Sequence, residues 1–307
     1  MILCCGEALI DMLPRTSTAG EPAFAPYAGG AVFNSAIALG RLGVPTEFFS
    51  GLSTDLFGEQ IRLVLAESGV GTRHAALSPR PTTLAFVRLQ DGHATYTFYD
   101  ENTAGRLLSE HDLPALGDGV DAMLFGAISL IPEPCGSAYE ALMRREHGRR
   151  VVMLDPNIRP GFISDRDAHL ARMRRMIAMA DIVKLSDDDL AWFGEAGSPA
   201  DVAARWLDGG PRLVIVTGGS KGATAYSRAG SVTVDSLKVD VIDTVGAGDT
   251  FNAGVLASLH DQGLLTKTGI GSLSQDEIRV ALTLGTKAAA VTVSRAGANP
   301  PWRHELA

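Results

Sequence analysis

Hydrophobic and polar positions follow two different periods along this chain. Apolar runs of strand length occur at residues 2–5, 122–126 and 150–154, and the run at 122–126 precedes a stretch at 133–145 with helical spacing of its apolar residues. From residue 120 onward the two patterns alternate steadily. This alternation predicts an α/β protein in which strands and helices follow one another.

Two segments depart from the alternation. Residues 14–28 are rich in Pro, Gly, Ser, Thr and Ala, and they lack a helical period, so they are interpreted as a loop or short strands. Residues 82–99 alternate between apolar and polar positions on both sides of a turn at Asp91-Gly92. This second pattern predicts a β-hairpin that interrupts the β/α order.

The composition sets limits on size and partners. The chain has 307 residues, of which 46% are hydrophobic, enough for one large α/β domain or two smaller ones. A net charge of -8, with no long run of Lys or Arg, argues against a nucleic-acid surface. No apolar stretch reaches the roughly 18 residues of a membrane span, so no membrane partner is expected.

The cysteines and the N-terminus indicate the compartment. The three cysteines, Cys4, Cys5 and Cys135, are expected to be buried free thiols, which is typical of a reducing cytosol. The chain starts with a strand-like run and has no basic segment or cleavage site, so no signal peptide is predicted. We therefore expect a cytoplasmic protein. The seven histidines are scattered, and this spacing argues against a histidine metal site.

The most informative stretch is residues 243–251, Asp-Thr-Val-Gly-Ala-Gly-Asp-Thr-Phe. Its small-residue loop, Gly246-Ala247-Gly248, stands between a strand-like run at 236–242 and a helical pattern. Backbone amides of such a loop can approach an anion, and a helix N-terminus adds positive potential. Asp249 is then well placed to take a proton from a hydroxyl that attacks a phosphoryl group. From the residues alone, an ordinary helix cap at Asp249 is the alternative.

A second glycine motif lies near the N-terminus. Gly29 and Gly30 precede Asn34 at the start of a small-residue helical pattern. The two glycines let the backbone approach a ligand, and the Asn34 amide can both donate and accept hydrogen bonds. Asp11 follows the first apolar run, where ligands gather in open α/β sheets, and its carboxylate suits a polyol. A solvated aspartate before Pro14 is the alternative.

The two glycine motifs resemble the signatures of the ribokinase (PfkB) family of sugar kinases. Residues 243–249 match all six fixed positions of Asp-Thr-x-Gly-Ala-Gly-Asp, and residues 29–34 match Gly-Gly-x-x-x-Asn. The resemblance implies one kinase domain over residues 1–307, a doubly wound α/β fold with helices on both faces of a mainly parallel sheet. It also implies a small β-sheet lid built from about 12–28 and 82–102.

The resemblance also assigns roles in an ATP-dependent phosphorylation of a sugar hydroxyl, with Mg²⁺ on the β- and γ-phosphates. Asp249 would be the general base, and the amides of Gly246, Ala247 and Gly248 would form the anion hole. Arg159, in an Asp-x-Asn-x-Arg string at 155–159, could reach substrate or the phosphoryl group; a surface salt bridge is its alternative role. The substrate-binding set would be Asp11, Gly29, Gly30, Asn34, Phe98 and Asp249.

Nucleotide contacts follow from the family's Thr-x-Gly-x-x-Gly. Here that motif is met by Thr217, Gly219 and Gly222, and Gly246 and Gly248 would also contact the phosphates. Lys184 is a further candidate for phosphate contact. The chain lacks the glycine patterns of P-loop and dinucleotide-binding proteins, which lowers the support for those classes.

Metal contacts are implied at two places. The family's Asn-x-x-Glu is replaced by Ser186 and Asp189, so Asp189 would organise Mg²⁺ through water. The three consecutive aspartates at 187–189 could instead simply favour a helix N-terminus. A K⁺ site would use Asp243 and Val245.

The acceptor is inferred from the lid strand. The string at 155–159 resembles the fructokinase and 2-keto-3-deoxygluconate kinase branch. Asp100 and Glu101, which follow Phe98-Tyr99, favour a neutral sugar, although Arg88 and Arg106 could serve an anionic one. We therefore expect D-fructose, phosphorylated at its 6-hydroxyl. The alternatives are a 2-keto-3-deoxygluconate kinase and a non-catalytic sugar-binding regulator. A homodimer through the lid edge is a further expectation.

Overall fold

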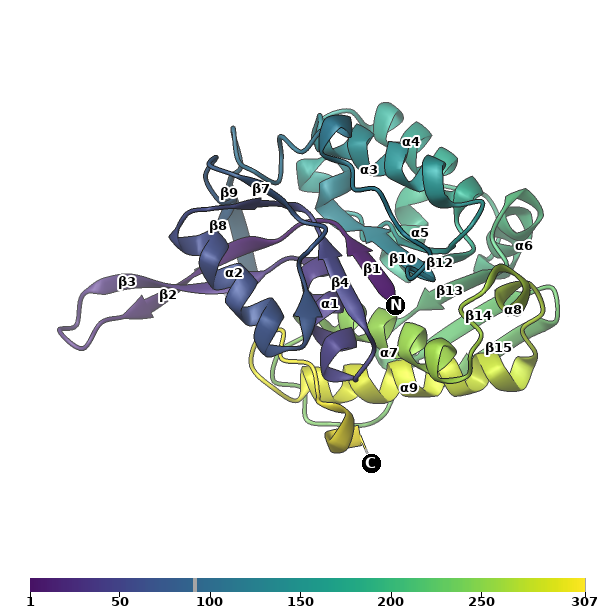
Figure 1. Ribbon diagram of the computed structural model, residues 1–307. Helices are drawn as coiled ribbons and strands as arrows, with labels where there is room; N and C mark the ends of the chain where they lie inside the picture. Colours follow the sequence, from purple (N-terminus) through teal and green to yellow (C-terminus); the bar gives the residue numbers. More distant parts are fainter. Residues whose placement is uncertain (91–92, 307) are drawn as a thin grey trace.

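The computed structural model describes residues 1–90 and 93–306 and is built on a nine-stranded sheet (Figure 1). Across this sheet the strands run in the order β15-β14-β13-β12-β11-β10-β1-β4-β6. In chain order they are β1 (Ile2–Cys5), β4 (Thr46–Phe49), β6 (Val70–Gly71), β10 (Ala122–Gly126), β11 (Val151–Asp155), β12 (Ile182–Ser186), β13 (Leu213–Thr217), β14 (Ala223–Ser227) and β15 (Gly230–Val234).

The sheet is parallel from β6 to β13, and β14 and β15 add an antiparallel edge. The strands β1, β10 and β11 at its centre are buried along their whole length and, except for Asp155 at the end of β11, carry no charged side chain, as expected for parallel strands covered on both faces. Successive side chains therefore enter two separate cores. Cys4 and Cys5 belong to different cores, and both are buried free thiols, as predicted.

Helices cover both faces of this sheet (Figure 1). One core is formed with α1 (Ala31–Arg41), α2 (Leu56–Glu67), α7 (Ala247–Asp261), α8 (Lys267–Gly271) and α9 (Gln275–Val293). The other is formed with α3 (Cys135–Glu146), α4 (Arg166–Met179), α5 (Asp187–Phe193) and α6 (Pro199–Gly209). Short 3₁₀ turns occupy Glu110–Asp112, Ala127–Leu130, Pro160–Phe162, Gly219–Lys221 and Arg303–Leu306.

A separate four-stranded sheet joins the two segments that depart from the β/α pattern. Its order is β3 (Pro22–Gly29), β2 (Leu9–Thr16), β8 (Leu84–Gln90) and β9 (His93–Tyr99). The hairpin over 82–99 is confirmed, and the turn predicted at Asp91-Gly92 lies outside the described residues. The β2–β3 hairpin extends away from the body of the molecule (Figure 1). Two short strands, β5 (Gly51–Ser53) and β7 (Ala76–Ser78), pair separately.

The strand predicted at 236–242 is wrong. This segment follows β15, the last strand at its edge of the sheet, and it has no ladder partner. Its apolar side chains Leu237, Val241 and Ile242 are exposed, and the Ile242 amide donates to the Val293 carbonyl at the end of α9. A β-branched run favours a strand only where a neighbouring strand can accept its hydrogen bonds.

The chain changes direction across the sheet at β1, which lies between β4 and β10. In open α/β sheets the ligand crevice lies outside the carboxyl ends of the strands at such a point. The loops that follow β1, β10 and β11 begin there, and α5 begins there directly after β12.

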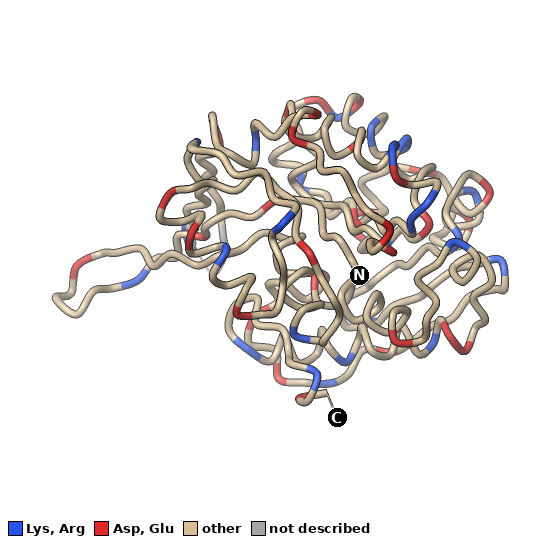
Figure 2. Tube along the Cα trace, viewed as in Figure 1, with Lys and Arg blue, Asp and Glu red and all other residues tan. Residues whose placement is uncertain are grey.

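Charged residues of both signs occur throughout the described part of the chain. Acidic and basic residues are interspersed along the described chain (Figure 2). Among the helices of residues 1–90 and 93–306, none has both the length and the apolar character that a membrane crossing requires.

Candidate active site

A cavity of about 380 Å³ opens at the carboxyl ends of the central strands. Loops after β1, β10 and β11, the end of β12, the starts of α1 and α7, and the small sheet all contribute to its lining. It brings together eleven residues that the sequence singled out: Asp11, Gly30, Asn34, Phe98, Arg159, Lys184, Val245, Gly246, Ala247, Gly248 and Asp249.

The glycine loop forms the N-terminus of α7. Gly246 is the N-cap, with φ of 78°, a left-handed conformation that glycine adopts without strain. A Cβ there would also lie 2.7 Å from the Cβ of Ala298. The Ala247 amide donates to the Thr244 carbonyl at 3.3 Å. First-turn amides of an α-helix lack intrahelical acceptors, so the amides of Gly246 and Gly248, which line the cavity, are the donors that this loop offers to an anion.

Asp249 is not a helix cap. It lies inside the first turn of α7, and no side chain caps this helix. Its Oδ2 accepts a hydrogen bond of 2.9 Å from Asn34 Nδ2 on α1, and its carbonyl accepts one of 3.1 Å from Ser35 Oγ. Asn34, which lies 215 positions before Asp249 in the chain, therefore fixes the Asp249 carboxylate in the cavity.

Burial tunes the acidity of Asp249. Its pKa is raised to about 7, chiefly because burial removes water from the carboxylate, and the negative charge of Asp155 adds to this effect. The Asn34 hydrogen bond and the Lys184 charge act in the opposite direction. A carboxylate with a pKa near neutrality suits general-base catalysis.

Asp11 faces the cavity from β2 in the small sheet and is not in a loop after β1. A Cβ on Gly29 would lie 2.3 Å from Asp11 Oδ2, so glycine at this position makes room for the carboxylate. Burial raises the pKa of Asp11 to about 6. At higher pH its oxygens are free to accept hydrogen bonds from hydroxyl groups.

Beneath the glycine loop lies a buried charged cluster that we name the Lys184 cluster: Lys184, Asp155 and Asn252. Asp155 Oδ2 accepts from Lys184 Nζ at 3.1 Å and from Asn252 Nδ2 at 2.6 Å. A Cβ on Gly248 would lie 3.0 Å from Lys184 Nζ, so the ammonium group lies against the loop. The carboxylates of Asp155, Asp189 and Asp249 raise the pKa of Lys184 against the effect of burial, which keeps it charged.

The sequence analysis did not assign Asn252. Asn252 follows Asp249 by three positions, the spacing that places two side chains on one side of a helix, and this signal was available. Asp155 appeared only as the first residue of the string at 155–159. Its partner Lys184 comes from the neighbouring strand, which no local pattern shows.

The chain matches the model of the family described as "pfkB family carbohydrate kinase" over residues 1–305. The chain belongs to this family. A fructokinase of Rhizobium leguminosarum bv. trifolii is 58% identical over 91% of this chain and 86% of that protein. A probable chloroplastic fructokinase of Arabidopsis thaliana is 34% identical, with 97% of this chain and 79% of that protein covered.

Solved structures agree with the assignment to the pfkB family. A Xylella fastidiosa fructokinase with bound ATP superposes with a TM-score of 0.88 at 28% identity, over 99% of this chain and 97% of the other. A Vibrio cholerae fructokinase holding fructose, ADP and calcium gives a TM-score of 0.82 at 26% identity, over 97% and 94%. The ribokinase-like fold expected from the sequence is confirmed, and this pfkB kinase belongs to a family that uses ATP.

Glu7 was missed by the sequence analysis of this pfkB kinase. It is half-buried after β1, where its Oε1 accepts from the Ala31 amide at the start of α1 and its Oε2 accepts from the Ser129 amide. Burial raises its pKa. Glu7 lines the cavity and connects the loops that follow β1 and β10.

Two non-glycine residues of the cavity have positive φ: Ala127 with 62° and Asn157 with 43°. Such conformations cost free energy and concentrate at functional sites.

Arg159 also lines the cavity, and its Nη1 donates to the carbonyl of Ile158. Within the described residues Arg159 forms no ion pair, which removes the surface salt-bridge interpretation.

Three expected nucleotide residues lie outside the lining of the cavity of about 380 Å³, which we name the transfer cavity. Thr217 ends β13, and Gly219 and Gly222 form the turn into β14, with φ of 55° and 84°. The Gly218 amide donates to the Gly222 carbonyl and closes this turn. The turn is at the same edge of the sheet as the cavity because it follows a parallel strand.

Asp189 lies in the first turn of α5, so the aspartate run does stand at a helix N-terminus, and with Ser186 it forms the capping box of this helix. Its Oδ2 accepts from the Ser186 amide at 3.0 Å, and its Oδ1 accepts from the Ile158 amide at 2.8 Å. Asp243 similarly accepts from the amides of Val245 and Gly297. Each carboxylate therefore has a structural role in positioning a loop.

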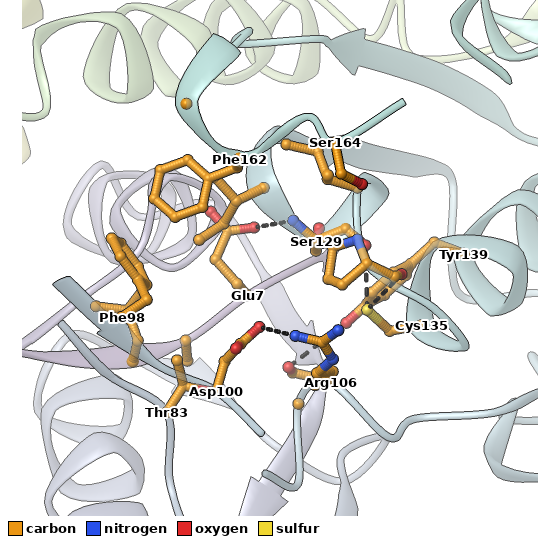
Figure 3. Close-up of a pocket in the computed structure, with 18 residues that line it drawn as sticks. Glu7, Thr83, Phe98, Asp100, Arg106, Ser129, Cys135, Tyr139, Phe162 and Ser164 are labelled. Carbon is orange, nitrogen blue, oxygen red and sulfur yellow. Dashed lines mark hydrogen bonds and ion pairs between the residues drawn. The ribbon is translucent and has the colours of Figure 1, made fainter. Parts of the chain in front are cut away.

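A second cavity of about 320 Å³, drawn in Figure 3, shares five lining residues with the transfer cavity. In it Arg106 Nη1 donates to Asp100 Oδ2 at 2.8 Å. Glu101 and Arg88 are exposed and do not line either cavity. Four charged side chains were considered in inferring the acceptor: Arg88, Asp100, Glu101 and Arg106. Of these four, Asp100 and Arg106 line the second cavity.

Proposed function

We propose that this chain is an ATP-dependent fructokinase that phosphorylates D-fructose at its 6-hydroxyl. The observation that carries the proposal is the buried carboxylate of Asp249, held by Asn34 at the N-terminus of α7. The 58% identity to a fructokinase supports fructose as the acceptor. The approximately 380 Å³ cavity has room for a sugar, with hydroxyl acceptors at Asp11.

In the proposed mechanism, Asp11, Gly29, Gly30 and Phe98 hold the sugar. Its 6-hydroxyl oxygen attacks the γ-phosphorus of ATP while Asp249 takes the hydroxyl proton. The new O–P bond forms as the bond from the γ-phosphorus to the β–γ bridging oxygen breaks, and ADP leaves with that electron pair. At no stage does this route require a covalent enzyme intermediate.

Negative charge on the transferring phosphoryl group is stabilised from two sides. The amides of the Gly246–Gly248 loop and the dipole of α7 act from the helix N-terminus. Lys184 adds a full positive charge beside Gly248. Arg159, which lines the same cavity, is the proposed second cation.

We propose that the nucleotide substrate is MgATP, with the ion carried by its phosphates. Asp189 fits a magnesium role poorly because both its oxygens already accept backbone amides and it does not line the transfer cavity. Asp243 and Val245 stay the proposed ligands of K⁺, which would brace the loop before α7. Thr217, Gly219 and Gly222 are the proposed contacts for the distal phosphates.

We also propose that the small sheet, with segments near 12–28 and 82–102, acts as a lid of a single domain, residues 1–307. A lid would exclude water, which competes with the sugar for the phosphoryl group. The lid edge is the proposed site of a homodimer. A cytoplasmic location is proposed because the three cysteines are buried free thiols.

The test is coupled ADP release with MgATP and fructose, ribose, glucose, adenosine and 2-keto-3-deoxygluconate. We expect fructose to give the highest kcat/KM. A preference for the keto-acid would leave the kinase chemistry and reject the acceptor. Sugar binding by calorimetry without any ADP release would support the regulator instead, which the intact Asp249 and the fructokinase relatives do not favour.

A further inference from the structure

The second cavity continues the transfer cavity away from Asp249. The two cavities share one wall, made of Glu7, Leu9, Phe98, Ile128 and Phe162. None of the residues Gly246–Asp249 lines the second cavity. Past this shared wall, the second cavity is open to the end of an acceptor that lies opposite to a reacting hydroxyl at Asp249.

The second cavity carries a balanced ion pair. Its lining includes the charged residues Glu7, Asp100 and Arg106. The Arg106 guanidinium points into the cavity between Asp100 and Cys135 (Figure 3). The pair is about one-third exposed, with side-chain exposures of 36% for Arg106 and 29% for Asp100, so a ligand in the cavity can contact both side chains.

The sum of these charges disfavours an anion. Two carboxylates oppose one guanidinium, and that guanidinium already donates to Asp100. A ligand carboxylate would have to displace Asp100 from Arg106 while remaining near it. A neutral hydroxyl, in contrast, can use the remaining N–H groups of Arg106 and the free lone pairs of Asp100 without breaking the pair.

We propose that the second cavity is the far end of the acceptor site, and that the Asp100–Arg106 pair selects neutral sugars against sugar acids. This inference rests on the proposed function, because it assumes that the acceptor hydroxyl lies at Asp249. Asp100 is the specificity residue: it keeps Arg106 from acting as an anion site. Removing the Asp100 charge while leaving Arg106 in place converts this end of the site into a carboxylate receptor.

The backbone around Asp100 permits a clean test. The Asp100 carbonyl, not its carboxylate, accepts from the amide and the hydroxyl of Thr103, and Thr103 Oγ1 in turn accepts from the Arg106 amide. The turn that carries both residues of the pair is therefore kept in Asp100→Asn. Glu101→Gln is the matched control, since Glu101 is the adjacent, exposed carboxylate and does not line the cavity.

The experiment compares kcat/KM for 2-keto-3-deoxygluconate with kcat/KM for fructose in each variant. This acid carries its carboxylate at the end opposite to its primary hydroxyl. We expect Asp100→Asn to raise the acid-to-fructose ratio at least tenfold, Glu101→Gln to change it less than twofold, and the double variant Asp100→Asn with Arg106→Gln to lose the gain. Because a ratio is measured, a partial loss of folded enzyme cancels; Asp100→Ser is the second variant if Asp100→Asn does not fold.

Two results would overturn the inference. One is a ratio in Asp100→Asn no higher than in Glu101→Gln. The other is a gain that persists when Arg106 is also replaced. If the unmodified enzyme does not phosphorylate fructose, the proposed function fails, and the charge selection is then measured by calorimetric binding of the acid: at least tenfold tighter binding to Asp100→Asn is expected, and equal affinity rejects it.

Discussion

Burial gives Asp249 its chemistry and also makes it costly to the fold. With a pKa raised to about 7, the carboxylate is a far better proton acceptor than an exposed aspartate. The base must be ionised to act, so activity is lost as the pH falls below its pKa. We expect kcat/KM for fructose to fall tenfold per pH unit below about 7. A pH profile that is flat from 5 to 8 would contradict this role.

Replacing the base should remove the chemistry and spare the nucleotide site. Asp249→Asn keeps the shape of the side chain and its contact with Asn34, after an amide rotation, but it cannot accept the proton. General-base removal costs roughly 10² to 10⁴ in rate. We expect kcat to fall by this factor, while the dissociation constant of an ATP analogue, measured by calorimetry, changes less than threefold. Near-normal kcat would exclude Asp249 as the base.

The same substitution should stabilise the protein at alkaline pH. The pKa of Asp249 rises on folding from 3.8 to about 7, so the folded state binds this proton more tightly and loses that advantage as the pH rises through 7. At pH 8 the buried charge costs up to about 4 kcal/mol at 1.36 kcal/mol per pKa unit. Chemical denaturation should give Asp249→Asn a higher free energy of unfolding than the parent protein at pH 8, and this difference should become smaller towards pH 4. A difference that does not depend on pH would refute this prediction.

At the scale of elements, the sequence predicted those helices and strands whose periodicity lies within one continuous segment. The helical pattern after Asp249 and the hairpin over 82–99 were both found from their periodicity. The run at 236–242 was predicted wrongly because strand formation needs a neighbour, and β15 closes that edge of the sheet. Asp189 shows the same limit: its second acceptor bond joins it to Ile158, 31 positions away.

The sequence predicted the site residues that belong to a single motif. It did not predict contacts between residues from different helices and strands. Asp249 and Asn34 were found from separate signatures, but their hydrogen bond joins α7 to α1. Glu7 bridges two loops through backbone amides, which leaves no trace in the local sequence. The Lys184 cluster likewise combines β11, β12 and α7, so only the folded chain shows it.

The Lys184 cluster yields a prediction at this scale. Asn252 and Asp155 hold Lys184 against Gly248, so Asn252→Ala should loosen the cation where phosphoryl charge develops. Losing one preorganised donor of this kind costs about 10² to 10³ in kcat. Since Asn252 acts through Asp155, we expect a smaller loss, about tenfold in kcat with little change in KM for fructose. Steady-state kinetics would check this.

Asn252→Asp and Ser258→Ala serve as controls. Asn252→Asp places a second carboxylate beside Asp155 and should lower kcat further. Ser258 is a buried polar residue of the same helix outside the cluster, so its replacement should affect stability more than kcat. An Asn252→Ala enzyme with unchanged kcat would show that Lys184 does not need this support.

At the scale of the whole molecule, the small sheet stands out because its β2–β3 hairpin extends beyond the body (Figure 1). On one face of this sheet, the aromatic side chains Phe24 and Tyr99 are 48% and 61% exposed. Phe86 lies between them, with ring centroids 5.0 Å from Phe24 and 5.5 Å from Tyr99. An exposed aromatic face on a sheet with open edges favours association with another copy.

This arrangement predicts a link between assembly and catalysis. Phe24→Lys places a charge in the exposed aromatic face and should shift the protein from dimer to monomer in light scattering. Because Asp11 lies on the neighbouring strand β2, loss of the paired lid should raise KM for fructose several-fold more than KM for ATP. Leu63→Lys, on the exposed side of α2, is the control for adding a charge at an exposed apolar site, and it should change neither property. A parent protein that is monomeric at assay concentrations would reject the dimer, whereas a dimer that survives Phe24→Lys would move its interface away from this face.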